Sequence, residues 1–274
     1  MKQLQYVLIA LFLIGFAFSG FAKEMTMQEI EKDLVKIFEQ IKPNKDYDLM
    51  IKLNAQFRNK LVGYIEKYPE TLNYPFQSLV DMGFICITSE DGLFRIYNWD
   101  TWEGGTMHCF INIFVYKSNG KVYCFPIKEV SSFDDSGKPV EEIPYFFSEI
   151  YTMKSNNVTY YLVIENGLFS NKDCSQSIII YTIENNELIK ASIIEGAGSK
   201  ISFPFNFFSV VDRPERPLRL IKFDPGKKII YIPIVYDDGT VTDRFIIYQF
   251  NGEYFKYLKT EKKQKNNQGK FSSL

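Results

Sequence analysis

The sequence is poor in the residues that build metal sites and catalytic centres. It contains one histidine, His108, in 274 residues. A zinc site made of several histidines is therefore excluded, and any Ser-His-Asp or Cys-His arrangement would have to use His108. No Gly-x-Ser-x-Gly motif accompanies this histidine. We therefore predict no catalytic residues, no metal and no cofactor, and we favour a binding role over an enzymatic one.

Cysteine is scarce as well, and its spacing carries no known motif. The absence of a Cys-x-x-Cys pair gives no support to a zinc knuckle or a thioredoxin-type redox site. In an exported protein the cysteines would allow up to two disulfides, but a chain of this size does not require them. We expect mostly free, buried thiols at the four positions Cys86, Cys109, Cys124 and Cys174.

Neither sign of charge dominates the chain. Lysine and arginine number 32 against 33 aspartate and glutamate residues, so the formal net charge is −1. A nucleic-acid-binding protein is expected to carry a strongly basic face, and this balance excludes that class. The hydrophobic content of 46% and the aromatic content of 16% supply enough apolar material for a core, which argues against disorder over most of the length.

The one long hydrophobic run lies at the start of the sequence and has the pattern of a secretory signal peptide. Lys2 precedes an apolar run over residues 7–18, and Gly20 and Ala22 provide the small residues of a cleavage site. No cysteine follows, so lipid anchoring is not expected, and the run is short for a membrane span, which needs about 20 residues. We predict signal peptide 1–22 and an exported protein, periplasmic or extracellular, with no membrane span after cleavage.

Residues 23–82 have the periodicity of a helical hairpin. Thr26 and Glu29 fit a capping box that opens a helix ending before Pro43, and Asp46 or Asp48 begins a second helix. Pro75 is expected to begin a short third helix that Gly83 closes. The second helix is expected to bury a stripe formed by Leu49, Leu53, Phe57, Leu61, Ile65 and Tyr68.

Residues 83–258 change to short β-rich runs separated by turn residues. Asp91-Gly92, Asn119-Gly120 and Asn251-Gly252 are typical of two-residue hairpin turns, and Asn156-Asn157 and Asn185-Asn186 are weaker versions. These hairpins recur at roughly 30–35 residues, the kind of period that marks stacked β units. The fold class predicted is mainly β, an antiparallel hairpin meander that is propeller-like, with a sandwich or open barrel as the alternative. Residues 259–274 are predicted to form a lysine-rich flexible tail.

Two of the hairpin segments resemble the hairpins that recur in β-propeller repeats. They are residues 89–95, with the sequence Ser-Glu-Asp-Gly-Leu-Phe-Arg, and residues 223–229, with the sequence Phe-Asp-Pro-Gly-Lys-Lys-Ile. The resemblance covers these two short segments and points to no specific family. It implies four-stranded antiparallel units packed against one another.

The turns also predict a strand register for the first hairpins. A four-residue loop at residues 102–105 places Ile96 opposite Ile111 and Trp99 opposite His108, while Ile87 faces Ile96 and Val115 faces Cys124. In this register Cys86 lies on the opposite face of the sheet from Cys109 and Cys124. The last two share a face but lie too far apart along the strands to bridge.

The segment 97–108 holds both tryptophans and the histidine, and it is the candidate ligand site. Aromatic faces can stack on sugars or on partner side chains, and charged neighbours give orientation. The alternative is that Trp99 and His108 are packing residues, with Trp102 the best candidate for exposure. The candidate site residues are Arg95, Tyr97, Trp99, Asp100, Trp102, Glu103 and His108.

These observations lead to three functional hypotheses. The first is an exported, non-catalytic binding or interaction protein with a protein or glycan partner. The second is a carbohydrate-binding or carbohydrate-active protein that uses residues 99–108, since a carboxylate pair such as Asp100 and Glu103 needs no visible motif. The third is a structural component of an envelope assembly. The sequence does not separate them, because a fold alone does not fix a function.

Overall fold

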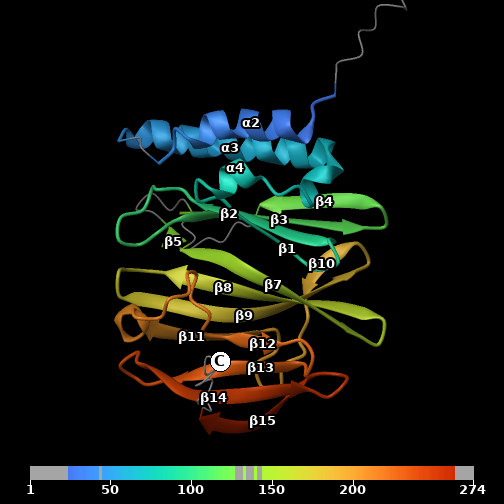
Figure 1. Cartoon of the computed structure of the whole chain (residues 1–274), viewed down its shortest axis with the longest axis vertical. Helices are drawn as coiled ribbons and strands as arrows, with labels where there is room; N and C mark the ends of the chain where they lie inside the picture. Colours follow the sequence, from blue (N-terminus) through green and yellow to red (C-terminus); the bar gives the residue numbers. More distant parts are fainter. Residues whose placement is uncertain (1–23, 43–44, 127–131, 134–138, 141–143, 263–274) are drawn as a thin grey trace, which may run out of the picture.

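The structure, a computed structural model, describes residues 24–42, 45–126, 132–133, 139–140 and 144–262. A layer of helices lies at one end of a stack of antiparallel sheets (Figure 1). The chain is mainly β with N-terminal helices, as predicted. The helical elements in chain order are α2 (Met27–Phe38), α3 (Tyr47–Lys67), η2 (Pro69–Leu72), α4 (Gln77–Val80) and, between the later strands, η3 (Phe207–Val210).

Three sheets of four or five strands follow one another along the chain and along the stack (Figure 1). The first contains β1 (Ile85–Thr88), β2 (Phe94–Asp100), β3 (Phe110–Ser118) and β4 (Lys121–Pro126). The second contains β7 (Tyr145–Ser155), β8 (Val158–Leu168), β9 (Asp173–Glu184), β10 (Glu187–Lys190) and β11 (Lys200–Asn206), and β10 and β11 both pair with β9. The third contains β12 (Lys222–Asp224), β13 (Ile229–Val235), β14 (Val241–Phe250) and β15 (Phe255–Lys262). The short strands β5 (Ser132–Phe133) and β6 (Pro139–Val140) pair with each other.

Hydrophobic cores separate the successive layers. One core joins the helices to the first sheet, a second lies between the first and second sheets, and a third lies between the second and third sheets. Sheets that pack face to face over apolar side chains form a sandwich. The open, sandwich-like stack corresponds to the alternative architecture stated above.

Three of the five predicted hairpin turns form as two-residue turns at the expected residues, whereas Asp91-Gly92 and Asn251-Gly252 lie in longer connections over residues 89–93 and 251–254, where only the glycine has positive φ. Asn119 and Gly120 both have positive φ, at 47° and 78°, and they join β3 to β4. Asn156 and Asn157 join β7 to β8, and Asn185 and Asn186 join β9 to β10, again with positive φ. Asparagine tolerates this left-handed conformation, and two such residues in succession match the twist of a hairpin.

The helices begin where their capping residues predict. Thr26 and Glu29 form the capping box of α2, and the Asp46 side chain caps α3 by accepting from the Leu49 backbone N–H. The predicted buried stripe of α3 is correct except at Leu49, whose side chain is 43% exposed. In the first turn of α3 the buried apolar side chain is that of Met50 instead. Pro75 does not begin the third helix. That helix starts at Gln77, after Phe76 adopts a positive φ of 48°.

We expect Thr26→Ala to lower the free energy of unfolding by about 1 kcal/mol. The Thr26 hydroxyl accepts from the Glu29 backbone N–H at 3.2 Å, and alanine leaves that donor without its cap. Thr26→Ser keeps the acceptor and serves as the matched control. Urea unfolding followed by circular dichroism measures both variants, and equal losses in the two would show that the capping oxygen is not the stabilising group.

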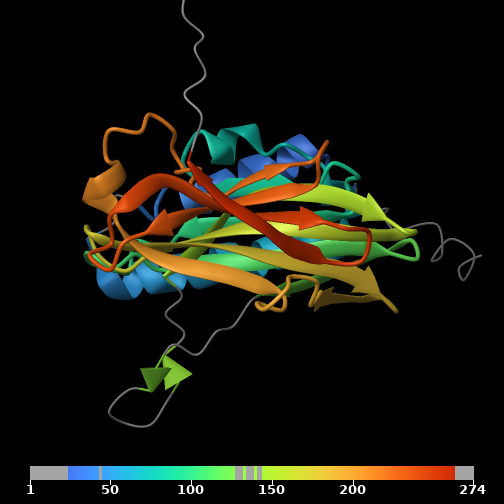
Figure 2. The same cartoon turned by 90° about the horizontal axis from the view of Figure 1, so that it is seen from below.

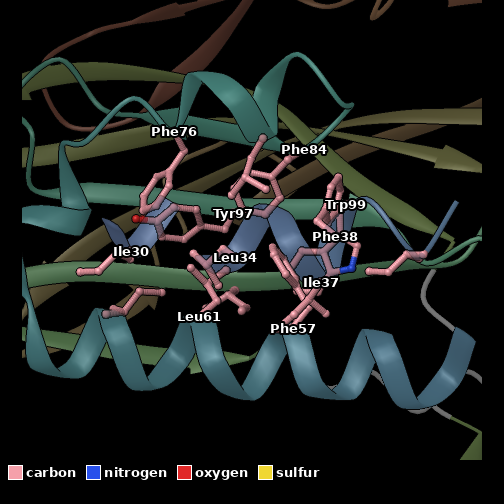
Figure 3. Packing of buried hydrophobic residues seen from close by; sticks show 14 of the residues in the cluster. Ile30, Leu34, Ile37, Phe38, Phe57, Leu61, Phe76, Phe84, Tyr97 and Trp99 are labelled. Atoms are coloured by element: carbon pink, nitrogen blue, oxygen red, sulfur yellow. The ribbon is translucent and has the colours of Figure 1, made fainter. Parts of the chain in front are cut away.

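The core between the helices and the first sheet is dense in aromatic rings (Figure 3). Trp99 of β2 lies 4.9 Å from the Phe57 ring of α3 and 5.8 Å from the Phe84 ring, measured between ring centroids. Tyr97 stacks on Phe84 at 5.8 Å. Edge-to-face and offset contacts of this kind add to the stabilisation that burial already gives.

The register of β2 against β3 differs from the prediction. Ile87 faces Ile96 and Val115 faces Cys124 as expected, but Ile96 pairs with Phe114 instead of Ile111. Trp99 pairs with Ile111, and His108 lies outside the strands. The cause is the connection from β2 to β3, which spans residues 101–109 and not the short loop at 102–105.

The register change also alters the face of the first sheet on which Cys86 lies relative to Cys124. Cys86 and Cys124 both pack against the helical core, so they share a face of the first sheet, contrary to the prediction. All four cysteines lie among the described residues and none is part of a disulfide, in line with the expected thiols, although Cys86 and Cys124 are only half-buried.

Both predicted terminal segments lie largely outside the described residues. The predicted signal peptide, residues 1–22, lies outside them entirely. The predicted tail begins too early at residue 259, because β15 continues to Lys262 and pairs with β14 as far as Arg244. Among the described residues, no helix combines the length and the apolar character needed to cross a membrane.

Candidate functional site

Three of the predicted site residues lie in the core and attach the helical layer to the first sheet. The Arg95 guanidinium donates to the backbone carbonyls of Thr71 and Leu72 at 3.0 and 2.9 Å. The Tyr97 hydroxyl donates to the Thr71 carbonyl at 2.5 Å, and burial raises the Tyr97 pKa. Trp99 is fully buried between neighbouring rings, so its faces are not available to a sugar.

Asn54 of α3 connects this core to the loop that follows β2. Its side-chain oxygen accepts from the Trp99 indole N–H at 3.0 Å, and its amide nitrogen donates to the Thr101 carbonyl at 2.8 Å. The same nitrogen donates to the Glu103 carboxylate at 3.0 Å. Glu103 therefore helps to hold the loop 101–109 on the helix.

Asp100 organises the rest of this loop through both of its carboxylate oxygens. Oδ1 accepts from the Trp102 backbone N–H at 2.8 Å, which holds Trp102 at a positive φ of 61°. Oδ2 lies 2.6 Å from Nδ1 of His108. Trp102 is 41% exposed, and the Lys42 ammonium group lies over its ring at 4.8 Å. The structure thus brings Asp100, Trp102 and His108 together and separates them from Trp99.

His108 lies against the second sheet and lines a cavity there. Its backbone N–H donates to the Leu168 carbonyl at 3.2 Å, which joins the β2–β3 loop to the end of β8. The cavity has a volume of about 320 Å³. Its wall consists of His108, Phe146, Asn166, Gly167, Leu168, Ser170, Asn171, Cys174, Ser175, Phe205, Phe207, Arg216, Pro217 and Leu218.

Most of this wall is apolar. Phe146, Phe205 and Phe207 supply aromatic surface from β7, β11 and η3. Gly167 allows β8 and β9 to approach closely here, because a Cβ at this position would lie 2.4 Å from the Ser175 hydroxyl oxygen. A small apolar cavity with few polar groups is the usual form of a small-molecule site.

Arg216 supplies positive charge at the cavity and orders the loop that carries it. Its guanidinium donates to the backbone carbonyls of Arg213 and Val211 at 2.6 and 2.9 Å, and it lies 5.5 Å from the Phe207 ring. In Figure 2 the loop after η3 extends from the side of the stacked sheets. Arg216 is an exposed residue that lines the cavity, and its guanidinium also donates to the Glu215 carbonyl at 2.7 Å.

Gln176 holds the far side of the cavity wall in place. This side chain is fully buried in β9 and donates to the Leu218 carbonyl at 2.7 Å and to the Asn166 side-chain oxygen at 2.8 Å. Its own oxygen accepts from the Ile221 backbone N–H at 2.7 Å. Gln176 therefore ties the backbone of Leu218 and Ile221 to β9.

Of the site residues predicted from the sequence, His108 lines this cavity and Asp100 contacts His108, while the other wall residues were not among the predicted ones. Its walls come from β7, β8, β9, β11 and the loop after η3, which lie far apart along the chain and share no motif. One part of the wall, the loop that carries Arg216 and Pro217, has a recognisable sequence. Residues 213–217 read Arg-Pro-Glu-Arg-Pro, and two prolines are typical of an ordered loop. No group of three metal-ligating side chains occurs among the residues that the structure describes.

We expect Cys174 and Cys124 to resist alkylation by iodoacetamide in the folded protein at about pH 8. Burial raises the pKa of the Cys174 thiol from 9.0 to about 11 and that of the Cys124 thiol to about 12. Both thiols are therefore protonated at neutral pH, and the thiolate is the reactive form.

The same shifts predict a loss of stability in alkali. Above a pH of about 9 the thiols of the unfolded chain ionise while Cys174 and Cys124 in the fold stay protonated, which favours unfolding. The stabilisation that the two buried thiols contribute is fully present below about pH 9. It is lost as the pH rises through the pKa values of Cys174 and Cys124 in the folded protein. Mass spectrometry of tryptic peptides with and without urea measures the alkylation, and rapid labelling of Cys174 without urea would contradict its assigned burial.

Comparison with protein-family models finds no match to this chain, and neither does comparison with curated proteins.

Proposed function

We propose that this chain is an exported binding protein whose cavity at His108 takes a small ligand with an apolar, ring-sized body and an acidic head group. The observation that carries the proposal is the imidazole of His108, fixed by Asp100 at 2.6 Å, in the wall of an otherwise mostly apolar cavity. Such a combination of apolar wall and few polar groups is typical of ligand sites.

The polar end of the ligand is assigned from His108 and Arg216. Asp100 occupies Nδ1 of His108, and Nε2 has no protein partner among the described residues. An oriented ring nitrogen of this kind can hydrogen-bond a ligand oxygen, and the Asp100 carboxylate fixes which nitrogen is presented. Arg216 lines the same cavity, and its positive charge favours a negatively charged head group.

The apolar end is assigned from the aromatic walls and the volume. The rings of Phe146, Phe205 and Phe207 offer faces and edges against which a flat ring can pack. A volume of about 320 Å³ is near the lower end for small-molecule sites, which suits one or two fused rings.

Two other side chains in the wall favour binding over catalysis. The raised pKa of Cys174 keeps its thiol protonated, which is the unreactive form. The hydroxyl of Ser170 is engaged in its own turn, where it donates to the Asp173 carboxylate at 2.9 Å and accepts from two backbone N–H groups. Neither group is presented as a nucleophile.

Isothermal titration of the purified protein with indole-3-acetate, 1-naphthoate and decanoate tests the proposal, with the neutral amide of each as the comparison. We expect at least one ring acid to bind and its amide to bind more weakly. His108→Ala is expected to weaken that binding about tenfold, or about 1.4 kcal/mol, because a hydrogen bond to the head group is lost.

Trp102→Ala is the matched control for the histidine variant. Trp102 lies in the same loop as His108 but does not line the cavity, so its removal is expected to leave the affinity unchanged. Equal losses in the two variants, or tighter binding of the amides, would contradict the proposed site.

Export is the second part of the proposal, and it rests on the pattern of residues 1–22. We expect N-terminal sequencing of the protein recovered from its source cells to begin at Lys23. An intact Met1 in the recovered protein would contradict export through this segment.

A further inference from the structure

A second cavity lies where the third sheet is incomplete. Strand β12 pairs with β13 only from Ile229 to Tyr231, so the remainder of β13 up to Val235 pairs with no strand on that side within the described ranges of the chain. The outer edge of β11, the last strand of the second sheet, lies across the gap. The cavity between the two edges has a volume of about 690 Å³ and is lined by consecutive residues of both strands.

The hydrogen-bond pattern shows which backbone groups of β11 face this cavity. The Phe207 N–H donates to the Lys172 carbonyl on the β9 side, whereas the Asn206 N–H donates to the Gly239 carbonyl on the other side. Because these directions alternate along a strand, Ser202 and Pro204 also point their backbone groups away from β9. No backbone bond is formed by the Ser202 N–H among the residues that the structure describes.

The same reasoning applies to β13 on the opposite wall. The Phe250 N–H donates to the Lys228 carbonyl, so Lys228, Ile230 and Ile232 direct their backbone groups to β14. Pro233 therefore directs its carbonyl to the cavity, and Val235 lies on the same open edge after the bulge. Both edges thus present carbonyl oxygens into the cavity, and β11 presents the Ser202 N–H as well.

The side chains that line the gap are largely apolar. Ile201, Phe203, Ile232 and Ile246 line the cavity and also belong to or pack against the core between the second and third sheets. A segment placed here would add its own apolar side chains to an existing core, which is the arrangement of an added strand.

Charge distinguishes one end of the cavity from the other. Asp173, Asp237 and Asp238 line the end where β11 and β13 both finish, and Lys172 is the cation beside them. All four side chains belong to exposed residues. Three carboxylates against one ammonium group favour a basic group in any segment that enters at this end.

We propose that this cavity accepts an extended segment of a partner polypeptide, about five residues long, as an added β-strand. Continuing the antiparallel ladder of β12 against β13 directs the N-terminal end of the segment toward Asp237 and Asp238. The segment therefore carries lysine or arginine at its N-terminal end, followed by apolar residues at alternate positions.

The prolines in the two walls set the selectivity of the site. Pro204 and Pro233 have no N–H, and proline on an open edge hinders indiscriminate pairing with other sheets. An inserted strand must donate to their carbonyls, so it needs free N–H groups at the matching positions. This site shares only the Phe205 wall with the cavity at His108, and its occupation does not depend on the function proposed there.

The test uses a fluorescein-labelled peptide, Lys-Lys-Val-Thr-Val-Thr-Val amide, with the full chain. Two control peptides replace both lysines by glutamate or both threonines by proline. We expect the first peptide to bind, with hydrogen exchange slowed in residues 200–206 and 232–236, and both controls to bind at least about fivefold more weakly.

Protein variants assign the binding to this cavity. Ser202→Pro removes the N–H that faces the gap, while Ser202→Ala keeps that N–H and loses the same hydroxyl, which bonds to Ser177. We expect the affinity to fall at least about fivefold for Ser202→Pro and to stay unchanged for Ser202→Ala. Asp237→Lys changes an exposed side chain, so we expect the fold to stay intact and the affinity to fall to a similar extent.

Three outcomes would overturn the proposal. The first is no binding of the lysine peptide at about 1 mM to folded protein. The second is binding that Asp237→Lys leaves unchanged and that does not slow exchange in residues 200–206. The third is a dimer in sedimentation that Ser202→Pro dissociates, which would make a second copy of the chain the occupant of this edge.

Discussion

Replacing Trp99 by alanine is expected to lower the free energy of unfolding by about 4 kcal/mol. The indole ring is fully buried between Phe57 of α3 and Phe84, and its N–H bonds to the Asn54 side chain. Alanine leaves a large cavity between the helices and the first sheet and removes the partner of a buried amide oxygen. The effect is large because this residue lies in the core that joins the two layers.

Trp102→Ala is the matched control, because this second tryptophan is 41% exposed and is expected to cost less than about 1 kcal/mol. Urea unfolding monitored by circular dichroism gives both values. The fluorescence of Trp102→Ala reports Trp99 alone and is expected to show the blue-shifted emission of a buried indole. Equal destabilisation by the two substitutions would contradict the assignment of Trp99 to the core.

Gln176→Leu is expected to lower the free energy of unfolding by about 3 kcal/mol. Leucine has a similar size but cannot replace the bonds to the Leu218 carbonyl and the Ile221 N–H. Leaving buried backbone groups without partners costs more than the loss of an exposed hydrogen bond. The same change releases the segment that carries Arg216 and Leu218, so the affinity of the cavity at His108 is expected to fall as well.

Gln56→Leu provides the comparison for this variant, since Gln56 is exposed on α3 and its substitution is expected to change stability by less than about 0.5 kcal/mol. Chemical unfolding and ligand titration are measured on both variants. A Gln176→Leu protein with unchanged stability and unchanged binding would show that the wall of the cavity is held by other contacts.

Local features of the fold follow from the sequence because each depends on a few adjacent residues. Thr26 and Glu29 suffice to define the start of α2, and the pairs Asn156-Asn157 and Asn185-Asn186 suffice to define hairpin turns. The mainly β class follows from the succession of these turns. The choice of the sandwich-like stack depends on how whole sheets bury their faces, and no local pattern encodes it.

The register of β2 against β3 could not be predicted from the residues of the connecting loop alone. A short loop at residues 102–105 is compatible with the Gly104-Gly105 pair, but Asp100 instead bonds both Trp102 and His108 and stabilises a longer connection. That change moves His108 out of the sheet. It also shifts the pairing of Trp99, which lies opposite Ile111 instead of His108.

The candidate site shows the same limit. Composition singles out His108 and both tryptophans, but Trp99 and Arg95 are residues of the core, and only Asp100 and His108 reach a cavity wall or orient a group in it. The remaining walls come from strands that meet only after folding. A sequence without a motif cannot show that Phe146 and Phe205 line one cavity with His108.

The nuclear magnetic resonance spectrum of the His108 ring tests the cavity most directly, because the chain contains a single histidine and its imidazole gives one unambiguous set of signals. In a titration with 1-naphthoate or indole-3-acetate, we expect the Nε2 and Cε1–H resonances to shift and saturate, while the neutral amides produce smaller shifts. Resonances that no ring acid moves, in a protein shown to be folded, would contradict a ligand site at His108.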